Sequence, residues 1–344
     1  MVALATLALL GASRLVAIRP DLTFPEVGKS AVSTLAPLAP GMTWDEAIVS
    51  WNLENPASAS VKMEARAWLG DKPTKWYTIA DWASDAKRFP RTSVNGQKDA
   101  DGNLDTDTLV LKHPADRLEL RATLTNHDAG PLPKLRLVTA SFLDSKKPVV
   151  PDAPAKNEAW GRTIDVPERA QGDYPNGGVL CSATSTSMLL WHYSKVLSRP
   201  ELDHDVPEVE ASVWDSEYKG AGNWPFNVAY SGSMPGMRAY VARFAGISDL
   251  EKWIAAGLPL ACSVSFDMLK GAPTGGSGHL VVLVGFTVDG DPVINDPARR
   301  GSVRHVYKRS DFERAWLYSK RTVYVVHPEG AKPPTGGEGR WMEK

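Results

Sequence analysis

The sequence predicts an all-β, sandwich-like domain over residues 23–144, followed by an α+β domain over residues 164–328. Three observations lead to this prediction. The chain has 344 residues, which is long for one domain and suits two. Apolar and polar residues alternate along short segments of the first half, whereas helical patterns precede strand patterns in the second half. Residues 145–163 between them are rich in Pro, Lys and Ala, as in an interdomain linker.

The chain starts with a short apolar segment. Residues 2–10 are too few to span a bilayer and resemble the apolar part of a secretory signal, although the usual preceding positive charge is missing. Residues 1–22 are therefore either a signal peptide whose recorded start is too late or a disordered apolar tail. The first interpretation is favoured and predicts a secreted or extracytoplasmic protein; a cytoplasmic location is the alternative. No later segment has the length of a membrane helix, so stable membrane insertion is not expected.

The composition limits what the protein binds. Charged residues make up 23% of the chain, and the formal net charge is −1 with no basic stripe, so a nucleic-acid partner is not expected. No Gly-rich phosphate loop, Cys-X-X-Cys or His-Glu-X-X-His pattern is present, and neither a metal nor another cofactor is expected. Cys181 and Cys262 are the two cysteines; one bridge between them is possible in number, but the sequence does not show whether they are close.

Short segments of alternating apolar and polar residues fill the first half of the chain. The clearest lie at residues 60–68, 107–112, 117–124 and 134–140, with polar turn clusters between them. Several short strands with polar breaks are typical of an all-β sandwich. The same region holds five tryptophans, Trp44, Trp51, Trp68, Trp76 and Trp82. Core packing is the favoured interpretation, and exposed rings that bind carbohydrate or a cell surface are the alternative.

From residue 164 onward, helical patterns come first and strand patterns follow. Helices are expected at residues 182–195, 237–245 and 250–256, the first with an N-cap oxygen from Ser182, Thr184 or Ser185. Strands are expected at residues 260–266, 280–288, 292–295, 303–306 and 322–326. This order predicts an α+β domain. Residues 329–344 are rich in Gly and Pro and are predicted to be a disordered tail.

Cys181 lies where a glycine-containing loop, residues 177–180, enters the first predicted helix. The start of a helix presents unpaired N–H groups and the positive end of the helix dipole. Both favour a thiolate over a thiol and lower the pKa of a cysteine at this position. The same N–H groups can bind a developing oxyanion. A buried, inert cysteine is the alternative.

His279 and Asp296 lie at the ends of two predicted strands. His279 opens an apolar strand, from which its ring can turn into a cleft, act as a general base and pair with a thiolate. Residues 287–291 predict a hairpin turn that brings Asp296 back towards this histidine, where it can orient the imidazole. The two sides of the turn differ in length, so either Asp296 lies beyond its strand or a bulge intervenes. A surface histidine and a turn-forming Asp before Pro297 are the alternatives.

Three further residues are candidates for the same site. Gln171 precedes Cys181 by ten positions, and a glutamine amide just upstream of a nucleophile can donate a second hydrogen bond to an oxyanion. Trp224 and Gly278 are candidates for substrate binding because each lies in a loop that can border the cleft. Core packing under its loop is the favoured alternative for Trp224.

Taken together and in order, these segments resemble the bacterial C39-like peptidase family. The similarity covers roughly residues 164–328 and rests on residues 165–171 (DVPERAQ), 173–188 (DYPNGGVLCSATSTSM), 222–227 (GNWPFN), 278–282 (GHLVV) and 294–297 (INDP). It implies a papain-like cysteine peptidase fold for the second domain. The first domain also resembles the β-rich N-terminal region of some secreted relatives.

The resemblance implies a role for each aligned residue. Cys181 matches the nucleophile, His279 the base, Asp296 the residue that orients the base, and Gln171 the oxyanion glutamine. Many members have a shorter Gln-to-Cys spacing, so the loop here has to fold back for Gln171 to reach the site. The relatives fused to peptide exporters cleave after a double glycine, and that specificity is not transferred to this chain.

The sequence therefore predicts a thiol hydrolase that cleaves peptide or related amide bonds through a Cys/His/Asp triad and an acyl-enzyme. Its expected partner is a peptide or protein substrate. Two alternatives stay open. The second domain is catalytically inactive in a binding or surface-associated protein, or the same triad transfers the acyl group to another acceptor.

Overall fold

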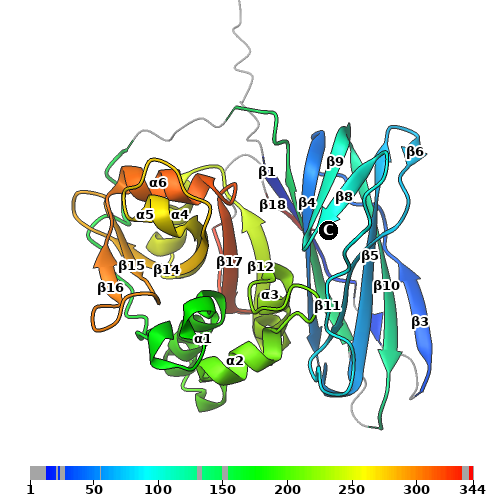
Figure 1. The fold of residues 1–344 in the computed structure, drawn as a ribbon, viewed down its shortest axis with the longest axis horizontal. Coiled ribbons are helices and arrows are strands. Elements are labelled where there is room, and N and C mark those ends of the chain that lie inside the picture. Colours follow the sequence, from blue (N-terminus) through cyan, green and yellow to red (C-terminus); the bar gives the residue numbers. More distant parts are fainter. Residues whose placement is uncertain are drawn as a thin grey trace, which may run out of the picture.

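The structure is a computed structural model that describes residues 13–20, 22–23, 28–54, 56–129, 134–148, 154–334 and 341–343. Figure 1 shows two lobes side by side: a first lobe built from strands and a second lobe in which helices flank a sheet. The predicted apolar signal segment, residues 2–10, lies outside the described residues. None of the helices among the described residues is long and apolar enough to cross a membrane.

The first lobe consists of two sheets that enclose one core. The larger sheet has the order β18-β1-β11-β4-β9-β8, with β2 paired to β11. Its strands are β1 (Ser13–Ile18), β2 (Leu22–Thr23), β4 (Trp44–Glu54), β8 (Gly102–Asp105), β9 (Thr108–Ala115), β11 (Lys134–Leu143) and β18 (Trp341–Glu343). The smaller sheet has the order β3-β10-β5-β6, with β7 paired to β5. Its strands are β3 (Ser30–Thr34), β5 (Ala59–Leu69), β6 (Lys72–Pro73), β7 (Tyr77–Ala83) and β10 (Arg117–Asn126).

Period-2 alternation explains this core. Side chains of β4 and β11 from one sheet and of β5 and β10 from the other belong to a single buried cluster. In β10 every second residue is buried, as expected for a strand with one face on a core. Two predicted boundaries differ from the structure. Residues 13–18 form β1 instead of belonging to an N-terminal tail, and residues 341–343 of the predicted disordered tail pair with β1 in parallel.

The tryptophans of the first lobe have two different environments. Trp44, Trp51 and Trp82 are fully buried, as core packing predicts. Trp68 and Trp76 are half-buried, and arginine guanidinium groups cover their rings at distances of 4.3 to 5.5 Å from the ring centres. Arg66 lies over both rings, Arg117 over Trp68, and Arg121 over Trp76. Since cations occupy these indole faces, stacking on sugar rings has no structural support here.

The second lobe is built around a six-stranded antiparallel sheet with the order β12-β17-β13-β14-β15-β16. Its strands are β12 (Met237–Arg243), β13 (Leu260–Ser265), β14 (Gly278–Phe286), β15 (Pro292–Asn295), β16 (Arg304–Val306) and β17 (Thr322–Pro328). The helices are α1 (Cys181–Val196), α2 (Val206–Val213), α3 (Trp224–Ser233), α4 (Ile247–Ala255), α5 (Phe266–Leu269) and α6 (Arg309–Leu317). The lobe thus combines helices with an antiparallel sheet, and its central strands are buried on both faces.

Alternate residues of the central strands face opposite helix layers. Val281 and Leu283 of β14 join a cluster with α4 and α6, whereas Leu280 and Val282 join a cluster with α1 and α3. The helix predicted at residues 237–245 is wrong, because this segment forms β12. Its residues are mostly apolar without a clear period, and pairing with β17 fixes them as a strand.

Strand β4 joins the two lobes. Its residues Ala47, Val49 and Trp51 face the core between the two sheets, whereas Ile48 packs in a cluster of the second lobe. Contacts with both lobes explain why nearly every residue of this strand is buried. Figure 1 shows β4 and β11 lying next to α3 and β12.

Polar side chains of the first lobe satisfy the outer edge of β12. The side-chain amide of Asn52 donates to the Ala239 carbonyl (2.7 Å) and accepts from the Ala239 N–H (3.1 Å). The Ser50 hydroxyl accepts from the Val241 N–H (3.0 Å). An edge strand with unpaired backbone groups is a site for unwanted strand pairing. Here the first lobe covers that edge of the sheet with side chains instead of another strand.

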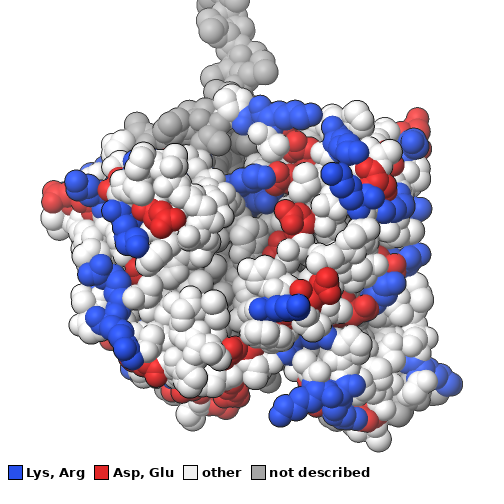
Figure 2. All heavy atoms as spheres, viewed as in Figure 1, with Lys and Arg blue, Asp and Glu red and all other residues white. Residues whose placement is uncertain are grey.

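Charges are spread over the molecule. On the face seen in Figure 2, the described lysines and arginines alternate with acidic side chains and do not gather in one continuous patch. This pattern agrees with the near-zero net charge of the sequence.

Candidate active site

Cys181 is the first residue of α1 and is partly buried. The N-cap is Leu180, whose side chain has no acceptor, so the prediction that Ser182, Thr184 or Ser185 caps this helix is wrong. The helix begins one residue earlier than predicted. Ser182 instead hydrogen-bonds to the Tyr324 hydroxyl of β17 at 2.9 Å. With no side chain at the N-cap to occupy them, the N–H groups of the first turn are available to the sulfur or to an oxyanion.

His279 and Asp296 form a buried hydrogen-bonded pair. His279 Nε2 lies 2.7 Å from Asp296 Oδ1, and the two residues are 4% and 1% exposed. Strands β14 and β15 form the predicted hairpin, with a bulge between Leu283 and Gly285. Asp296 follows the last residue of β15 and therefore lies beyond the strand, next to the start of β14. The sequence predicted either a bulge or an Asp296 that lies beyond its strand, and the structure contains both.

Tyr307 and Phe266 belong to the same site, although neither was predicted from the sequence as a site residue. The Tyr307 hydroxyl donates to Asp296 Oδ2 at 2.6 Å, and the Ala298 N–H donates to Oδ1 at 2.9 Å. Phe266 packs edge-on against the His279 ring with a centroid distance of 4.9 Å. The β15–β16 hairpin brings Tyr307 to Asp296. The strands predicted at residues 292–295 and 303–306 indicated that this segment could lie near Asp296. Their register could not be predicted from the sequence, so the contact of Tyr307 was not foreseen.

The electrostatics of the site favour an ion pair between Cys181 and His279. Burial raises the pKa of Cys181, but a hydrogen bond and the charge of His279, with backbone hydrogen bonds to Leu280 and Ser182, lower it overall. Burial lowers the pKa of His279, but hydrogen bonds to Asp296 and Cys181 raise it to about 9. Burial also raises the pKa of Asp296, and its bonds to His279 and Tyr307 more than offset this effect. Opposite shifts of this kind are typical of a reactive thiol and its base.

Gln171 lies in a segment that folds back on the sulfur-bearing helix. Residues Gln171–Asp173 and Gly177–Val179 form two short 3₁₀ turns that contact each other. A Cβ at Gly177 would overlap the Gln171 carbonyl oxygen, so this close approach requires glycine. The Gln171 N–H donates to the Pro297 carbonyl at 2.8 Å, directly after Asp296. Its side-chain oxygen is buried and has no hydrogen-bond partner among the described residues.

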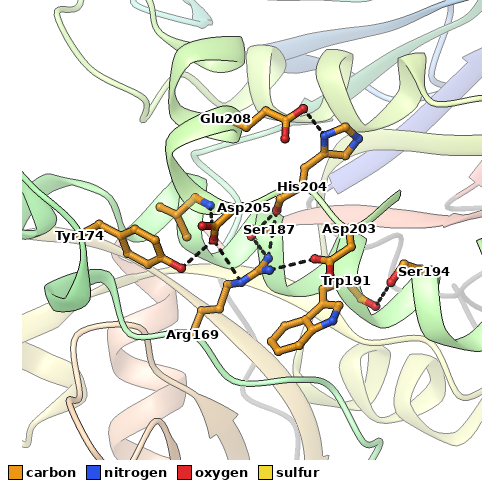
Figure 3. A network of polar contacts seen from close by, with 10 residues as sticks. Arg169, Tyr174, Ser187, Trp191, Ser194, Asp203, His204, Asp205 and Glu208 are labelled. Carbon is orange, nitrogen blue, oxygen red and sulfur yellow. Dashed lines mark hydrogen bonds and ion pairs between the residues drawn. The ribbon is translucent and has the colours of Figure 1, made fainter. Parts of the chain in front are cut away.

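Arg169 anchors this segment, as Figure 3 shows. Its guanidinium donates to Asp203 Oδ1 (2.8 Å), to the His204 carbonyl (2.9 Å) and to the Ser187 hydroxyl of α1. It also lies 4.4 Å from the centre of the Trp191 ring. The network therefore links the residue two positions before Gln171 to α1, the helix that begins with Cys181.

Asp205 ties down the other side of the same segment. It accepts from the Tyr174 hydroxyl at 2.7 Å, pairs with Arg169 at 3.4 Å and caps α2 through the Val206 N–H at 2.8 Å. Arg169 and Tyr174 flank Gln171 in the sequence. One carboxylate thus holds both ends of the turn that carries the predicted oxyanion glutamine (Figure 3).

The two predicted substrate-binding residues have different surroundings. Trp224 is half-buried at the first position of α3, and its backbone N–H donates to Asp107 Oδ2 of the first lobe at 3.0 Å. Gly278 is exposed beside His279, and a Cβ there would meet no atom within 4 Å. Space is therefore open next to His279, whereas the indole of Trp224 serves partly as core.

Cys262 differs from Cys181 in its burial and in the direction of its pKa shift. It is fully buried in β13, and burial raises its pKa well above that of a free thiol. Both cysteines are free, which excludes the bridge between them. Cys262 is therefore a core residue of the second lobe.

Comparisons with known proteins assign the two lobes separately. Residues 163–324 match the Peptidase_C39 like family, and residues 26–142 match the Peptidase C39 N-terminal domain. A search of curated proteins finds no significant match. Among solved structures, one described as a C39-like peptidase from Bacillus anthracis is 18% identical, with a TM-score of 0.36 over 48% of this chain and 98% of that chain. FLHE is 16% identical, with a TM-score of 0.21 over 38% of this chain and 93% of that chain. At these TM-scores neither structure bears on function.

Proposed function

We propose that this chain, whose residues 163–324 match the Peptidase_C39 like family, is a cysteine peptidase that cleaves peptide bonds with Cys181 as nucleophile. The observation that carries the proposal is the arrangement around that sulfur. Cys181 begins a helix, and the charge and hydrogen bonding of His279 lower the pKa of its thiol. His279 is itself held by buried Asp296. The lowered pKa of Cys181 and the raised pKa of His279 support a thiolate and imidazolium at neutral pH.

The proposed reaction has two halves. The Cys181 thiolate attacks the peptide carbonyl carbon, and the carbonyl electron pair moves onto the oxygen. Collapse of this intermediate breaks the C–N bond, and the imidazolium of His279 gives its proton to the leaving amine. A water molecule, deprotonated by His279, then attacks the thioester, releases the acid and restores the ion pair. Asp296 keeps the ring oriented through its bond to Nε2.

The oxyanion is stabilised by two donors in this proposal. One is the backbone at the start of α1, where no side-chain cap competes for the N–H groups. The other is the side-chain amide of Gln171, whose turn is fixed by Arg169 and Asp205 and by the backbone bond to Pro297. Removing one oxyanion donor from such a site lowers kcat by about 10²- to 10³-fold.

A library of short peptides, analysed by mass spectrometry after incubation with the protein, tests the proposal. Wild type is expected to cleave a subset of the peptides, and Cys181→Ala to cleave none. Gln171→Ala should lower kcat by about 10²- to 10³-fold without slowing the alkylation of Cys181. Products that persist with Cys181→Ala would rule out this nucleophile. Products in which the acyl group is joined to an amine would instead favour acyl transfer, and an unreactive Cys181 with no products would favour an inactive scaffold.

A further inference from the structure

The first lobe holds the loop that connects α2 to α3. Residues 214–223 connect α2 to α3 in the second lobe. Arg91 of the first lobe is 3% exposed, and its guanidinium donates to the carbonyls of Trp214 (2.8 Å) and Ala211. The same guanidinium donates to two carbonyls of its own lobe. This buried arginine therefore joins the beginning of the loop to the first lobe.

Asp215 fixes the loop from within. Its side chain is fully buried, and Oδ1 accepts from the N–H of Ser93 in the first lobe at 3.0 Å. Oδ1 also accepts from the N–H groups of Glu217 and Tyr218, and Oδ2 accepts from Asn223 Nδ2 at 2.8 Å. One carboxylate thus connects both ends of the loop to each other and to the first lobe.

Asp107 holds the end of the loop. It belongs to the β8–β9 turn of the first lobe, is 7% exposed, and its Oδ2 accepts from the N–H of Trp224 at 3.0 Å. Trp224 is the first residue of α3, where a carboxylate interacts favourably with the helix dipole. The loop is therefore anchored on the first lobe at both of its ends.

Tyr218 projects from the middle of this loop and is 51% exposed. A Cβ on Gly220 or on Gly222 would come within 3.1 Å of its ring, so glycine backbone supports one side of the ring. Asn227 of α3 joins this loop to α1, the helix that begins with Cys181: its side chain donates to the Ala221 carbonyl (2.8 Å) and accepts from the Thr186 hydroxyl (3.0 Å). Burial raises the pKa of Tyr218, and the charges of Asp107 and Cys181 raise it further. An aromatic ring with half of its surface exposed offers apolar contact area to a ligand.

Tyr318 approaches the same space from another element. It follows α6, is 45% exposed, and its hydroxyl donates to the Gly276 carbonyl at 2.6 Å, in the loop that leads to His279. Tyr318 is therefore held at the loop that leads to His279, and Tyr218 is held by close packing in the loop that leads to α3.

We propose that the first lobe completes the substrate cleft by holding the 214–223 loop, so that Tyr218 forms a wall beside Cys181 and binds a bulky apolar side chain near the scissile bond. The inference rests on the proposed peptidase function and adds the substrate class and a role for the first lobe. Aromatic rings contribute large apolar contact area when they bind another ring.

Two electrophiles that carry the same cysteine-reactive group test this inference. One presents two alanine side chains and the other two phenylalanine side chains, and iodoacetamide serves as a small reference. Mass spectrometry of intact protein gives the rate at which each reagent labels Cys181. Wild type is expected to prefer the phenylalanine reagent by tenfold or more.

Tyr218→Ala should reduce this preference to within about twofold of unity, and Tyr218→Phe should retain it because the ring remains. The iodoacetamide rate of each variant is the reference to which its rates with the two larger reagents are normalised. Asp107→Ala should weaken the preference because it releases the end of the loop, whereas Asp105→Ala, which removes an exposed carboxylate of the same turn, should not. The melting temperature of Asp107→Ala shows whether that variant is folded, and Tyr218→Ala tests the wall independently of it.

The outcomes separate the two proposals. Slow labelling of Cys181 by iodoacetamide would overturn the peptidase function itself. Fast iodoacetamide labelling, together with no phenylalanine preference or with a preference that survives Tyr218→Ala, would overturn the role of the wall alone.

Discussion

Tyr307 supplies the second strong hydrogen bond of Asp296, which makes this tyrosine part of the site through that carboxylate. Tyr307→Phe keeps the ring and removes the donor to Oδ2. A buried carboxylate that loses a donor costs about 1 to 3 kcal/mol. We therefore expect the free energy of unfolding in urea at pH 7 to fall by about that amount. Tyr318→Phe is the matched control, because its hydroxyl makes an exposed hydrogen bond, and it should change stability by less than about 0.5 kcal/mol.

The pH dependence of this difference has a definite sign. Asp296 has a lowered pKa in the folded protein, so its ionised form stabilises the fold at neutral pH, and this contribution is lost as the pH falls through that lowered pKa. Tyr307→Phe raises the pKa back towards its unfolded value. The stability gap between wild type and variant should therefore shrink in acid. Equal stability of Tyr307→Phe and Tyr318→Phe at pH 7 would contradict this account of Asp296.

The sequence could identify part of the site at this scale. Cys181 was predicted at a helix start and His279 at a strand opening, because each depends on a local pattern around one residue. The approach of Asp296 to His279 was predicted from the hairpin turn at residues 287–291. Tyr307 was not predictable, because its contact depends on the register of a second hairpin. Phe266 was missed because it lies directly after a strand, in a short helix that has no pattern of its own.

At the scale of elements, Arg169 joins the Gln171 turn to α1 through a planar fork of hydrogen bonds. Arg169→Lys keeps the charge but cannot reproduce the fork or the stacking on Trp191. We expect the variant to lose about 1 to 3 kcal/mol of stability. If the turn positions Gln171, kcat for a cleaved peptide should also fall while the alkylation rate of Cys181 stays unchanged.

Arg300→Lys is the control for Arg169→Lys. Arg300 pairs with Asp173 of the same turn, but both side chains are exposed, and such pairs contribute about 0 to 1 kcal/mol. The control is therefore expected to match wild type in stability and in kcat. An Arg169→Lys variant with normal kcat would show that the network stabilises the fold without positioning the glutamine.

Elements with a clear period were predicted better than those without one. Strands β5, β10 and β11 and helix α1 lie within a few residues of the predicted ranges. The segment of β12 was predicted as a helix because its apolar residues show neither period clearly. Strand β4 was not predicted because both of its faces are buried. Its sequence therefore lacks the alternation of apolar and polar residues that marks a strand with one solvent-exposed face.

At the scale of the whole molecule, the two lobes depend on each other at the edge of β12. Asn52→Ala removes both hydrogen bonds to Ala239 and leaves a buried N–H and a buried carbonyl without partners. Each such group costs about 1 to 3 kcal/mol. We expect the free energy of unfolding in urea to fall by at least about 2 kcal/mol. Asn103→Ala, in β8 of the same sheet and half-buried, should change it by less than about 0.5 kcal/mol.

Asn52 also explains a glycine in the facing helix. A Cβ at Gly232 of α3 would overlap the Asn52 amide, so this helix approaches the first lobe as closely as glycine allows. Separate, weakly coupled lobes would predict equal effects of Asn52→Ala and Asn103→Ala. Neither the interface nor the role of Asn52 in it was visible in the sequence, because both depend on two segments almost 190 residues apart.

The pH dependence of Cys181 alkylation by iodoacetamide tests the central claim most directly. In wild type we predict fast labelling of Cys181 already at mildly acidic pH, because His279 lowers the pKa of the thiol, and no labelling of buried Cys262 in the folded protein. In His279→Ala the partner charge is gone while burial remains, so labelling should slow and shift to alkaline pH. Slow labelling of Cys181 in wild type, or a pH profile that His279→Ala leaves unchanged, would contradict the thiolate and imidazolium pair.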